Sequence, residues 1–199
     1  MKANKSQIKP GKIFIICGPS GSGKTTLLAG LIKGKKIGKL LVKSRSITTR
    51  PRRTGERDKF EYFFVTEPEF KRLLKAKKIL EWTRYLGYYY GTPKGPLESK
   101  LRSGRNIGLC LDLKGARILK KLYPDNTVTV FVLPPSLDVL KSRIENRCSR
   151  TNKKEIARRI NLARRELLAA SQFDYCVLNQ NLRVALGKLK DIFLREINT

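Results

Sequence analysis

The sequence predicts an α/β fold in which a parallel sheet is flanked by helices. Short apolar runs recur along the chain, and most are followed by stretches whose apolar residues lie three or four places apart. Strands that alternate with helices in this way form parallel sheets covered by helices. The first apolar run leads directly into a glycine-rich loop. With 199 residues, the chain is long enough for one such domain with a small insert.

The glycine-rich loop runs Gly18-Pro-Ser-Gly-Ser-Gly-Lys-Thr25 and matches the pattern G-x-x-x-x-G-K-[ST] of a phosphate-binding loop. A predicted strand precedes it and a predicted helix follows it, as this motif requires. Glycines let successive backbone N–H groups point at one phosphate. Lys24 would place a positive charge at the β- and γ-phosphates, and the Thr25 hydroxyl would ligate Mg²⁺. The motif predicts a P-loop NTPase-type nucleotide site made by Gly18, Pro19, Ser20, Gly21, Ser22, Gly23, Lys24, Thr25 and Thr26.

The other elements follow from the same patterns. Strands are predicted at 13–17, 40–46, 62–65, 79–85, 107–111, 128–133 and 175–178. Helices are predicted at 25–33, 67–76, 93–103, 114–122, 137–147, 155–171 and 182–197. Turns or loops are predicted at 33–39, at 47–59 and after Tyr85.

The strand-rich section 40–92 interrupts the alternation of strand and helix. It therefore predicts an inserted subdomain on a core made of 12–39 and 93–198. Residues 1–11 are polar and basic, and we expect them to form a flexible end.

Composition narrows the classes of function. The chain contains no histidine, which excludes histidine metal ligands and histidine acid–base catalysis. Its four cysteines are widely separated, so we expect reduced, packed thiols. No stretch is long and apolar enough for a membrane span, and no signal peptide is evident, so we expect a cytoplasmic protein without membrane contact.

The net charge of +28 predicts attraction to polyanions, to nucleotides first and to nucleic acid only weakly. An ordinary solvated basic surface is the alternative interpretation. No basic motif with interleaved aromatic residues is present.

Two further stretches indicate the second substrate. Arg50, Arg52 and Arg53 lie in a Gly/Pro loop, and guanidinium groups bind phosphate through two hydrogen bonds. Taken alone, this loop is equally compatible with a solvated basic segment. Glu81 lies in an apolar strand close to tyrosines, and a buried carboxylate needs hydrogen-bond donors. Guanine offers two such donors, its N1–H and its exocyclic amine.

Several motifs together resemble the guanylate kinase family. They occur in the family's order between residues 13 and 197, and they read GPSGSGKTTL, S-x-S-x-TTR-x-x-R-x-GE-x5-YFFV, EW-x5-YYYGT, DLKGAR, VFVLPPSLDVLKSR and F-x-Y-x-V-x-N. The resemblance implies an ATP:GMP phosphotransferase, which converts GMP, and also dGMP, with ATP and Mg²⁺ by direct in-line transfer. It implies a P-loop NTPase-type fold with an inserted GMP-binding subdomain and a mobile lid at about 143–160. The enzyme would be a monomer or a homodimer.

The resemblance also implies roles for individual residues. The GMP phosphate would be held by Arg50, Arg53, Tyr62 and Tyr90. Guanine would be read by Ser46, Glu81 and Thr92, and Asp112 would also belong to the GMP site. Arg143, Arg147 and Arg159 match the lid, and Asn179 matches a position near the donor adenine. The residues expected to support transfer directly are Lys24, Arg50, Asp112, Arg147 and Arg159.

The chain departs from the family pattern at D-x-D-x-Q-G. Cys110 and Lys114 replace the first carboxylate and the glutamine, while Asp112 remains. These changes leave open a catalytically weakened module that binds nucleotides or partners. A kinase for another small molecule is a further alternative, against which the pairing of Glu81 with Ser46 argues.

Overall fold

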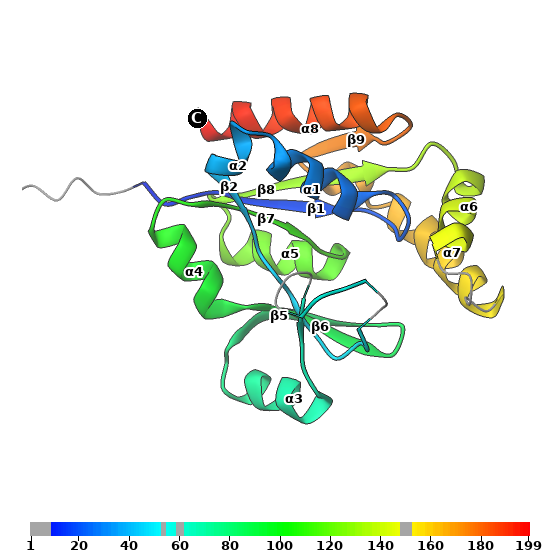
Figure 1. The fold of residues 1–199 in the computed structure, drawn as a ribbon, viewed down its shortest axis with the longest axis horizontal. Helices are drawn as coiled ribbons and strands as arrows, with labels where there is room; N and C mark the ends of the chain where they lie inside the picture. The colour runs from blue at the N-terminus through cyan, green and yellow to red at the C-terminus, as the bar shows by residue number, and fades with distance from the viewer. Residues whose placement is uncertain (1–8, 53–54, 59–61, 148–152) are drawn as a thin grey trace, which may run out of the picture.

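The computed structural model describes residues 9–52, 55–58, 62–147 and 153–199 (Figure 1). Its centre is a five-stranded parallel sheet with the order β2-β7-β1-β8-β9. The strands are β1 (Ile13–Cys17), β2 (Leu41–Lys43), β7 (Asn106–Cys110), β8 (Thr127–Leu133) and β9 (Tyr175–Leu178). In the middle of this sheet, Ile15 lies opposite Leu109 on one side and Thr129 on the other.

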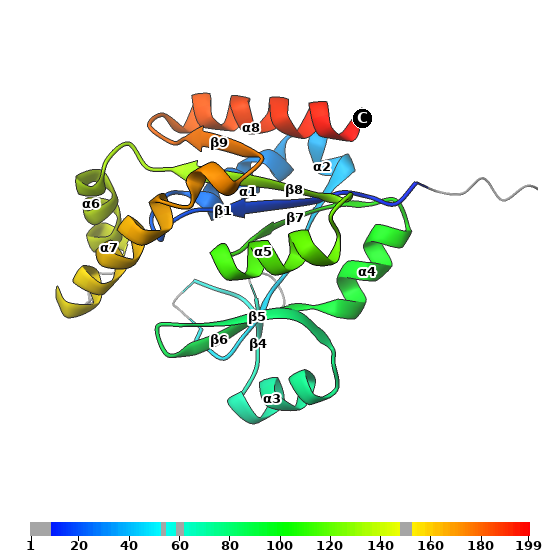
Figure 2. The same ribbon diagram turned by 180° about the vertical axis from the view of Figure 1, so that it is seen from behind.

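Helices cover both faces of this sheet (Figures 1 and 2). Alternate residues of a strand point to opposite faces, so Phe14 and Ile16 pack on one side while Ile13 and Ile15 pack on the other. The first face carries α1 (Lys24–Lys33), α2 (Ile37–Leu40) and α8 (Leu182–Ile197). The second face carries α4 (Lys94–Arg102) and α5 (Leu113–Leu122).

A second sheet lies below the first in Figure 1 and has the order β4-β3-β6-β5. Its strands are β3 (Ile47–Thr48), β4 (Phe63–Phe64), β5 (Ile79–Tyr85) and β6 (Tyr88–Pro93). The helix α3 (Glu67–Lys75) belongs to this part of the chain. It begins with a capping box, in which Thr66 and Glu69 satisfy each other's backbone N–H groups.

Two helices project from the side of the large sheet. They are α6 (Leu137–Arg147) and α7 (Lys153–Leu167), and a short 3₁₀ turn, η1 (Ala170–Gln172), follows them. Leu140 and Ile144 of α6 pack against Ala163 of α7, and the three residues form a small apolar cluster separate from the core of the large sheet. None of the helices in the described ranges is long and apolar enough to cross a membrane.

The element predictions were wrong in several places, and the helix expected at 155–171 ends at Leu167, with the separate turn η1 after it. The strand expected at 40–46 ends at Lys43 and belongs to the large sheet, not to the insert. The basic loop contains β3, whose two residues are too few to show a period. The turn expected after Tyr85 is limited to two residues, and β6 follows it. A short helix, α2, occupies the end of the stretch predicted as a turn and the first residue of the strand predicted at 40–46.

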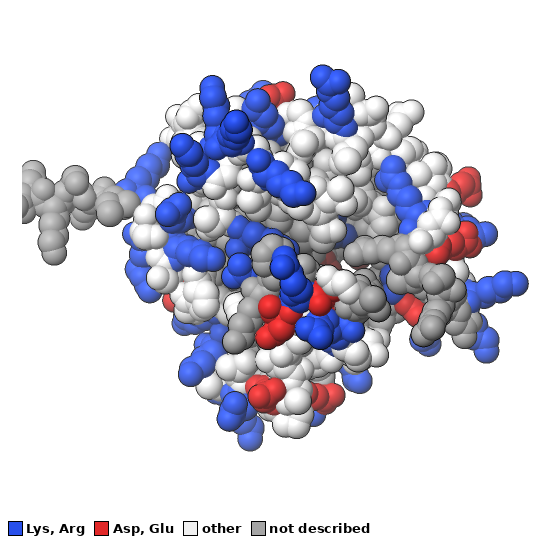
Figure 3. Space-filling model, in the orientation of Figure 1, with Lys and Arg blue, Asp and Glu red and all other residues white. Residues whose placement is uncertain are grey.

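Basic side chains cover much of the face shown in Figure 3. They gather over the blue α1–α2 region of Figure 1, and acidic side chains are sparse there. At the end of α1, in α2 and in the connection between them, Lys33, Lys35, Lys36 and Lys39 are all exposed. The acidic side chains visible in Figure 3 lie mostly lower down and at the side of the molecule.

Candidate active site

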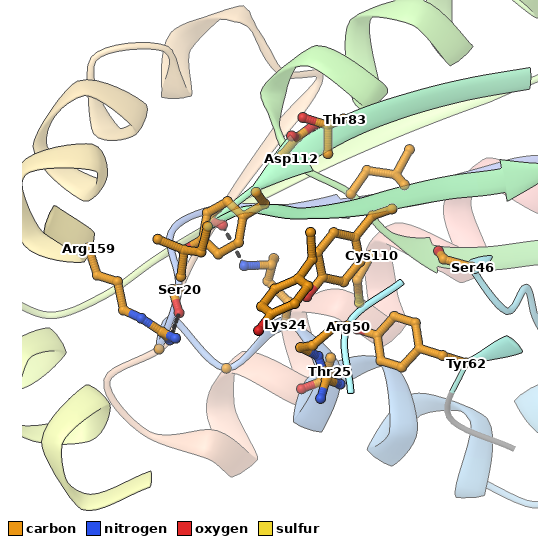
Figure 4. Close-up of a pocket in the computed structure, with 18 of the residues that line it drawn as sticks. Ser20, Lys24, Thr25, Ser46, Arg50, Tyr62, Thr83, Cys110, Asp112 and Arg159 are labelled. Carbon is orange, nitrogen blue, oxygen red and sulfur yellow. Dashed lines mark hydrogen bonds between the residues drawn. The ribbon is translucent and has the colours of Figure 1, made fainter. Parts of the chain in front are cut away.

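One cavity of about 1980 Å³ joins the phosphate-binding loop, the second sheet and the α6–α7 pair. Figure 4 shows Arg159 and Ser20 toward one end of it and Ser46 toward the other, with Lys24 between them. The cavity lies at the carboxyl ends of β1 and β7, which is where open parallel sheets bind their ligands. Glu81, Arg50 and Lys24 therefore share one cleft.

The phosphate-binding loop has the backbone that its glycines predict. Gly18, Gly21 and Gly23 have φ values of 131°, 86° and 96°, a region that other residues rarely adopt. A Cβ atom at Gly18 would lie only 2.5 Å from the carbonyl oxygen of Val132, so glycine is required there for space as well. The loop passes into α1 at Lys24, which places several N–H groups at a helix N-terminus.

Lys24 and Asn179 tie this loop together. The Lys24 ammonium donates to the carbonyl oxygens of Gly18 at 2.5 Å and Pro19 at 2.9 Å. The Asn179 amide donates to the carbonyl oxygen of Ser22 at 2.7 Å, and Arg143 donates to the carbonyl oxygen of Asn179 at 3.1 Å. Asn179, which the family resemblance places near adenine, thus also anchors the loop from β9.

The predicted triphosphate residues are not all exposed to the cavity. The lining includes Gly18, Ser20, Gly21, Gly23, Lys24, Thr25, Thr26, Arg143 and Asn179. Pro19 and Ser22 are outside this lining. Ser22 is fully buried, and its hydroxyl has no hydrogen-bond partner in the described part of the chain.

At the guanine end, Glu81 is held by two elements. Its side chain is 3% exposed, and the Thr92 hydroxyl donates to Oε1 at 2.5 Å. A Cβ atom at Gly115 in the first turn of α5 would lie 2.6 Å from Oε2, so only glycine leaves room for the carboxylate. Asp112 caps the same helix and accepts a hydrogen bond from the Gly115 N–H at 2.8 Å.

Burial raises the pKa of Glu81 to about 7, since the Thr92 hydrogen bond and the charge of Lys114 only partly offset it. The nearby charge of Asp112 acts in the same direction as burial. A ligand that offers two N–H groups would stabilise the ionised form of Glu81. Thr92 lies behind Glu81 and outside the cavity lining, so it orients the carboxylate.

Arg50 is buried among aromatic rings and one acid. Its exposed fraction is 9%, and both oxygens of Glu56 accept from its Nη2 at 2.9 Å. The guanidinium carbon lies 5.6 Å from the ring centre of Tyr62, which is in edge contact with Tyr90 at 6.1 Å. These three side chains and Ser46 line the same part of the cavity. Arg53 lies outside the described residues.

On the opposite side, α7 contributes Arg159. Its Nη1 donates to the Ser20 hydroxyl at 3.3 Å, and the guanidinium pairs with Glu155 on the same helix. Arg143 of α6 also lines the cavity. Arg147 ends α6, and its side chain lies outside the described part of the structure.

Sequence reasoning missed Glu166, a buried acid that lines the cavity. It lies on α7 seven residues after Arg159, and that spacing places both on one helix face. This spacing was the signal that could have found it. Burial raises the pKa of Glu166 to about 7, although the positive charge of Lys24 lowers it in part.

The residues present agree with a Mg²⁺ ion held mainly by nucleotide phosphates. Thr25 lies in the first turn of α1 and lines the cavity together with Asp112. Mg²⁺ in kinases is bound through one or two protein oxygens, phosphates and water. Within the described ranges, no group of three or more histidine, cysteine or acidic side chains would hold a metal ion by itself.

Comparison with known proteins gives a consistent result. The family model described as guanylate kinase matches residues 10–196. A guanylate kinase from Synechocystis sp. is 39% identical over 189 residues, which cover 95% of this chain and 96% of that protein. One from Rickettsia typhi is 40% identical over 186 residues, covering 94% and 92%. The crystal structure of guanylate kinase from Anaplasma phagocytophilum superposes with a TM-score of 0.77 at 27% identity, covering 96% of this chain and 88% of that one.

Proposed function

The chain belongs to the guanylate kinase family and phosphorylates GMP with ATP, and we propose that its two sheets hold these substrates end to end for direct transfer. The observation that carries this proposal is the single cavity shared by Lys24, Arg50 and Glu81. It provides an anion site at the helix N-terminus of the core, and a carboxylate with a buried guanidinium in the insert.

We propose that Glu81 selects guanine. Its carboxylate would accept from the N1–H and the exocyclic amine, while the Ser46 hydroxyl would donate to O6. Thr92 and Gly115 support this role because one orients the carboxylate and the other leaves it room. Adenine has an acceptor at N1, so it would leave the buried carboxylate without a donor, which costs about 1–3 kcal/mol.

We propose that Arg50, with Tyr62 and Tyr90, binds the phosphate of GMP. Arg50 is already desolvated and charged beside Glu56, so little reorganisation is needed when a phosphate arrives. Arg53 joins this site in the proposal on the strength of the sequence motif alone. The dianionic GMP phosphate would then lie in the part of the cavity next to Lys24.

Phosphoryl transfer between two bound nucleotides needs positioning and neutralisation of charge more than covalent chemistry. We propose that Lys24 neutralises the β- and γ-phosphates, that Arg143, Arg147 and Arg159 close over the triphosphate, and that Asp112 orients the guanine end together with Glu81. When bound, Mg²⁺ supplies further neutralisation of the phosphate charge, with Thr25 as its protein ligand. Exclusion of water by the α6–α7 pair protects ATP from hydrolysis.

The quaternary and cellular setting is also part of the proposal. We propose a cytoplasmic enzyme that acts as a monomer or a homodimer, with no membrane contact and only weak attraction to nucleic acid through charge. Its substrates are intracellular nucleotides, which supports this setting.

A substrate panel tests the proposal. With ATP and millimolar Mg²⁺, release of ADP should be fast with GMP, slower with dGMP and IMP, and negligible with AMP. IMP lacks the exocyclic amine and so isolates one of the two donors that Glu81 is proposed to accept. Equal rates with GMP and AMP would contradict the role of Glu81, and no turnover with GMP would contradict the whole assignment.

A further inference from the structure

Lys114 lies over an aromatic ring that belongs to the insert. Its Nζ atom is 5.0 Å from the ring centre of Trp82, which is within the range of a cation–π contact. Lys114 is in the first turn of α5 in the core, whereas Trp82 is on β5. In both ribbon views, α5 lies between the large sheet and β5 (Figures 1 and 2). The contact therefore joins the core to the part of the chain that carries Glu81.

The first turn of α5 meets β5 on both faces of the strand. Alternate residues of a strand point to opposite faces, and Glu81 lines the cavity while Trp82 does not. Next to Lys114, Gly115 lies so close to Glu81 that a Cβ atom there would be 2.6 Å from Oε2. Two consecutive residues of α5 thus meet two consecutive residues of β5, which stands at the end of the second sheet.

Trp82 is held in place from the side of the insert. Its ring centre lies 5.6 Å from that of Tyr89, and Tyr89 stacks on Phe70 of α3 at 5.2 Å. Trp82 and Lys114 are both exposed to solvent, and exposed cation–π pairs shift an equilibrium by about two- to five-fold. The ring therefore gives Lys114 a fixed point on the strand that carries Glu81.

The charge of Lys114 also acts on Glu81 directly. It favours the ionised carboxylate and so lowers the pKa of Glu81, against the stronger effect of burial. An electrostatic field of this kind does not need the Trp82 ring, whereas a contact that holds β5 in place does. Removal of the ring therefore separates the two effects.

We propose that Lys114 is a positioning residue for guanine recognition, which holds β5 against the first turn of α5 through Trp82 and so keeps Glu81 in place at the cavity. The inference rests on the proposed role of Glu81. It goes beyond that role because it names the contact that keeps this carboxylate of the insert in register with the core. Loss of the contact should weaken the binding of GMP and leave the binding of ATP unchanged, since other elements hold the phosphate-binding loop.

The test begins with two substitutions of Lys114. Lys114→Gln removes the cation and keeps a polar side chain, and Lys114→Arg keeps a cation that stacks on aromatic rings. Calorimetry on the full chain should show a loss of GMP affinity of about two- to five-fold for Lys114→Gln, recovery for Lys114→Arg, and no change for ATP. Steady-state kinetics should show the same change in KM for GMP with kcat unaltered. In a Trp82→Leu background, Lys114→Gln should cause no further loss of GMP affinity.

Fluorescence tests the contact itself. Trp82 is the single tryptophan of the chain, so its emission reports on this position alone. Acrylamide should quench the emission more steeply in Lys114→Gln than in the wild type, and Lys114→Arg should reverse the change. Lys121→Gln is the matched control, because it removes the same charge from an exposed position in the last turn of α5. It should alter neither the quenching nor the GMP affinity.

Equal losses of GMP affinity on Lys114→Gln in the wild-type and Trp82→Leu backgrounds would overturn the inference, because the effect would then come from charge alone. Wild-type GMP affinity in Lys114→Gln would overturn it as well. Thermal unfolding checks that each variant folds. If Trp82→Leu does not fold, the quenching experiment still decides, since unchanged quenching in Lys114→Gln would contradict the contact. If Glu81→Gln keeps the full preference for GMP over AMP, the proposed function fails. A normal effect of Glu81→Gln beside a silent Lys114→Gln overturns this inference alone, so the two failures are distinguishable.

Discussion

Glu81 links protein stability to substrate recognition through a single buried charge. The Thr92 hydroxyl satisfies one carboxylate oxygen, while the rest of the group faces the cavity. Glu81→Gln keeps an oxygen that can accept from Thr92, but it replaces the other carboxylate oxygen with an amide NH₂ group. That group is a donor and would face the N–H donors of guanine. We therefore expect kcat/KM for GMP to fall by about 10- to 100-fold, equivalent to about 1–3 kcal/mol.

Coupled ADP-release kinetics with GMP and AMP would measure this change. Glu98→Gln is a matched control, since Glu98 lies on α4 away from the cavity lining, where it accepts a hydrogen bond from the Tyr123 hydroxyl and forms a 3.8 Å ion pair with Arg102. Unchanged preference for GMP over AMP in Glu81→Gln would contradict the assignment.

The same residue predicts a pH dependence of stability. In the folded protein the pKa of Glu81 is about 7, against an ordinary value of 4.5. Between these values the unfolded chain ionises while the folded chain keeps its proton, so this group lowers stability as pH rises. Glu81→Gln removes the effect. We expect the variant to match the wild type near pH 4.5 and to exceed it by about 3 kcal/mol at pH 8, since each pKa unit is worth 1.36 kcal/mol.

Urea unfolding of the two proteins at pH 5, 6, 7 and 8, without nucleotide, measures this difference. A constant gap across that range would show that the charge of Glu81 carries no penalty in the folded protein.

Single residues also show where sequence reasoning stops. The sequence motifs predicted that Glu81, Arg50 and Lys24 belong to the site, and the cavity brings them together. The family resemblance gave Thr92 the same role as Glu81, yet it lies behind the carboxylate. A sequence gives residue types and spacing, but which side of a carboxylate a hydroxyl approaches depends on strand register. Here the register places Thr92 directly opposite Glu81.

At the scale of elements, the first turn of α5 is fitted to β5. Gly115 gives Glu81 its space, since a Cβ atom there would lie 2.6 Å from Oε2. Gly115→Ala should therefore displace the carboxylate and weaken GMP binding by at least ten-fold, while ATP binding stays unchanged. Gly187→Ala is the matched control, because that glycine lies within α8 and a Cβ atom would meet nothing within 4 Å.

Calorimetric titration with GMP and with ATP separates these outcomes. Gly187→Ala should bind both nucleotides as the wild type does and should be about 1 kcal/mol more stable, because alanine is the better helix former. Equal GMP affinity in both alanine variants would show that the contact between α5 and Glu81 is not needed.

The β5–β6 hairpin shows a strand that sequence patterns concealed. Glycines at 87 and 91 suggested one long turn, but only Leu86 and Gly87 form it, and Tyr88–Pro93 continues as a strand. Tyrosines favour strands, and this preference was outweighed by the glycine signal. Gly91 is instead a point of close approach, where a Cβ atom would lie 2.8 Å from Ile79.

The turn itself carries strain, because Leu86 has a φ of 49°. For an ordinary side chain this left-handed conformation costs roughly 1–2 kcal/mol, whereas asparagine tolerates it well. Leu86→Asn should therefore raise the free energy of unfolding by up to about 1 kcal/mol, as measured by urea unfolding. Leu86→Val is the contrasting variant and should be less stable than the wild type, since a branched Cβ suits this backbone poorly. Reversed signs would contradict the argument.

For the whole molecule, alternation of strand and helix was sufficient to predict a parallel sheet with an insert. The order β2-β7-β1-β8-β9 could not be derived in this way, because β2 joins the edge of the sheet beside a strand more than sixty residues later. Local patterns cannot reveal which strand becomes the neighbour of β1. The phosphate-binding loop was the exception, because its chemistry is contained in eight consecutive residues.

The net charge of +28 is a property of the whole molecule, and it predicts salt-dependent attraction to nucleic acid. Figure 3 shows basic side chains gathered over α1 and α2, where Lys33, Lys35, Lys36 and Lys39 are exposed. Release of counterions makes log K fall linearly with log salt concentration. We expect dissociation constants of about 10⁻⁶–10⁻⁴ M for a mixed-sequence oligonucleotide near physiological salt. Fluorescence anisotropy from 50 to 300 mM KCl measures the slope.

Charge reversal at two of these positions tests whether the face over α1 and α2 is responsible. Lys35→Glu with Lys36→Glu should flatten the salt slope by about two, since each phosphate contact adds roughly one. GMP phosphorylation should stay unchanged, because neither side chain lines the cavity. Reversal at Lys75 and Lys77, beyond the second sheet, changes the net charge equally and should leave most of the slope in place. An equal loss of salt slope in both variants would mean that only the total net charge of the protein matters, not its position. A wild-type affinity that does not change with salt would exclude electrostatic attraction to nucleic acid altogether.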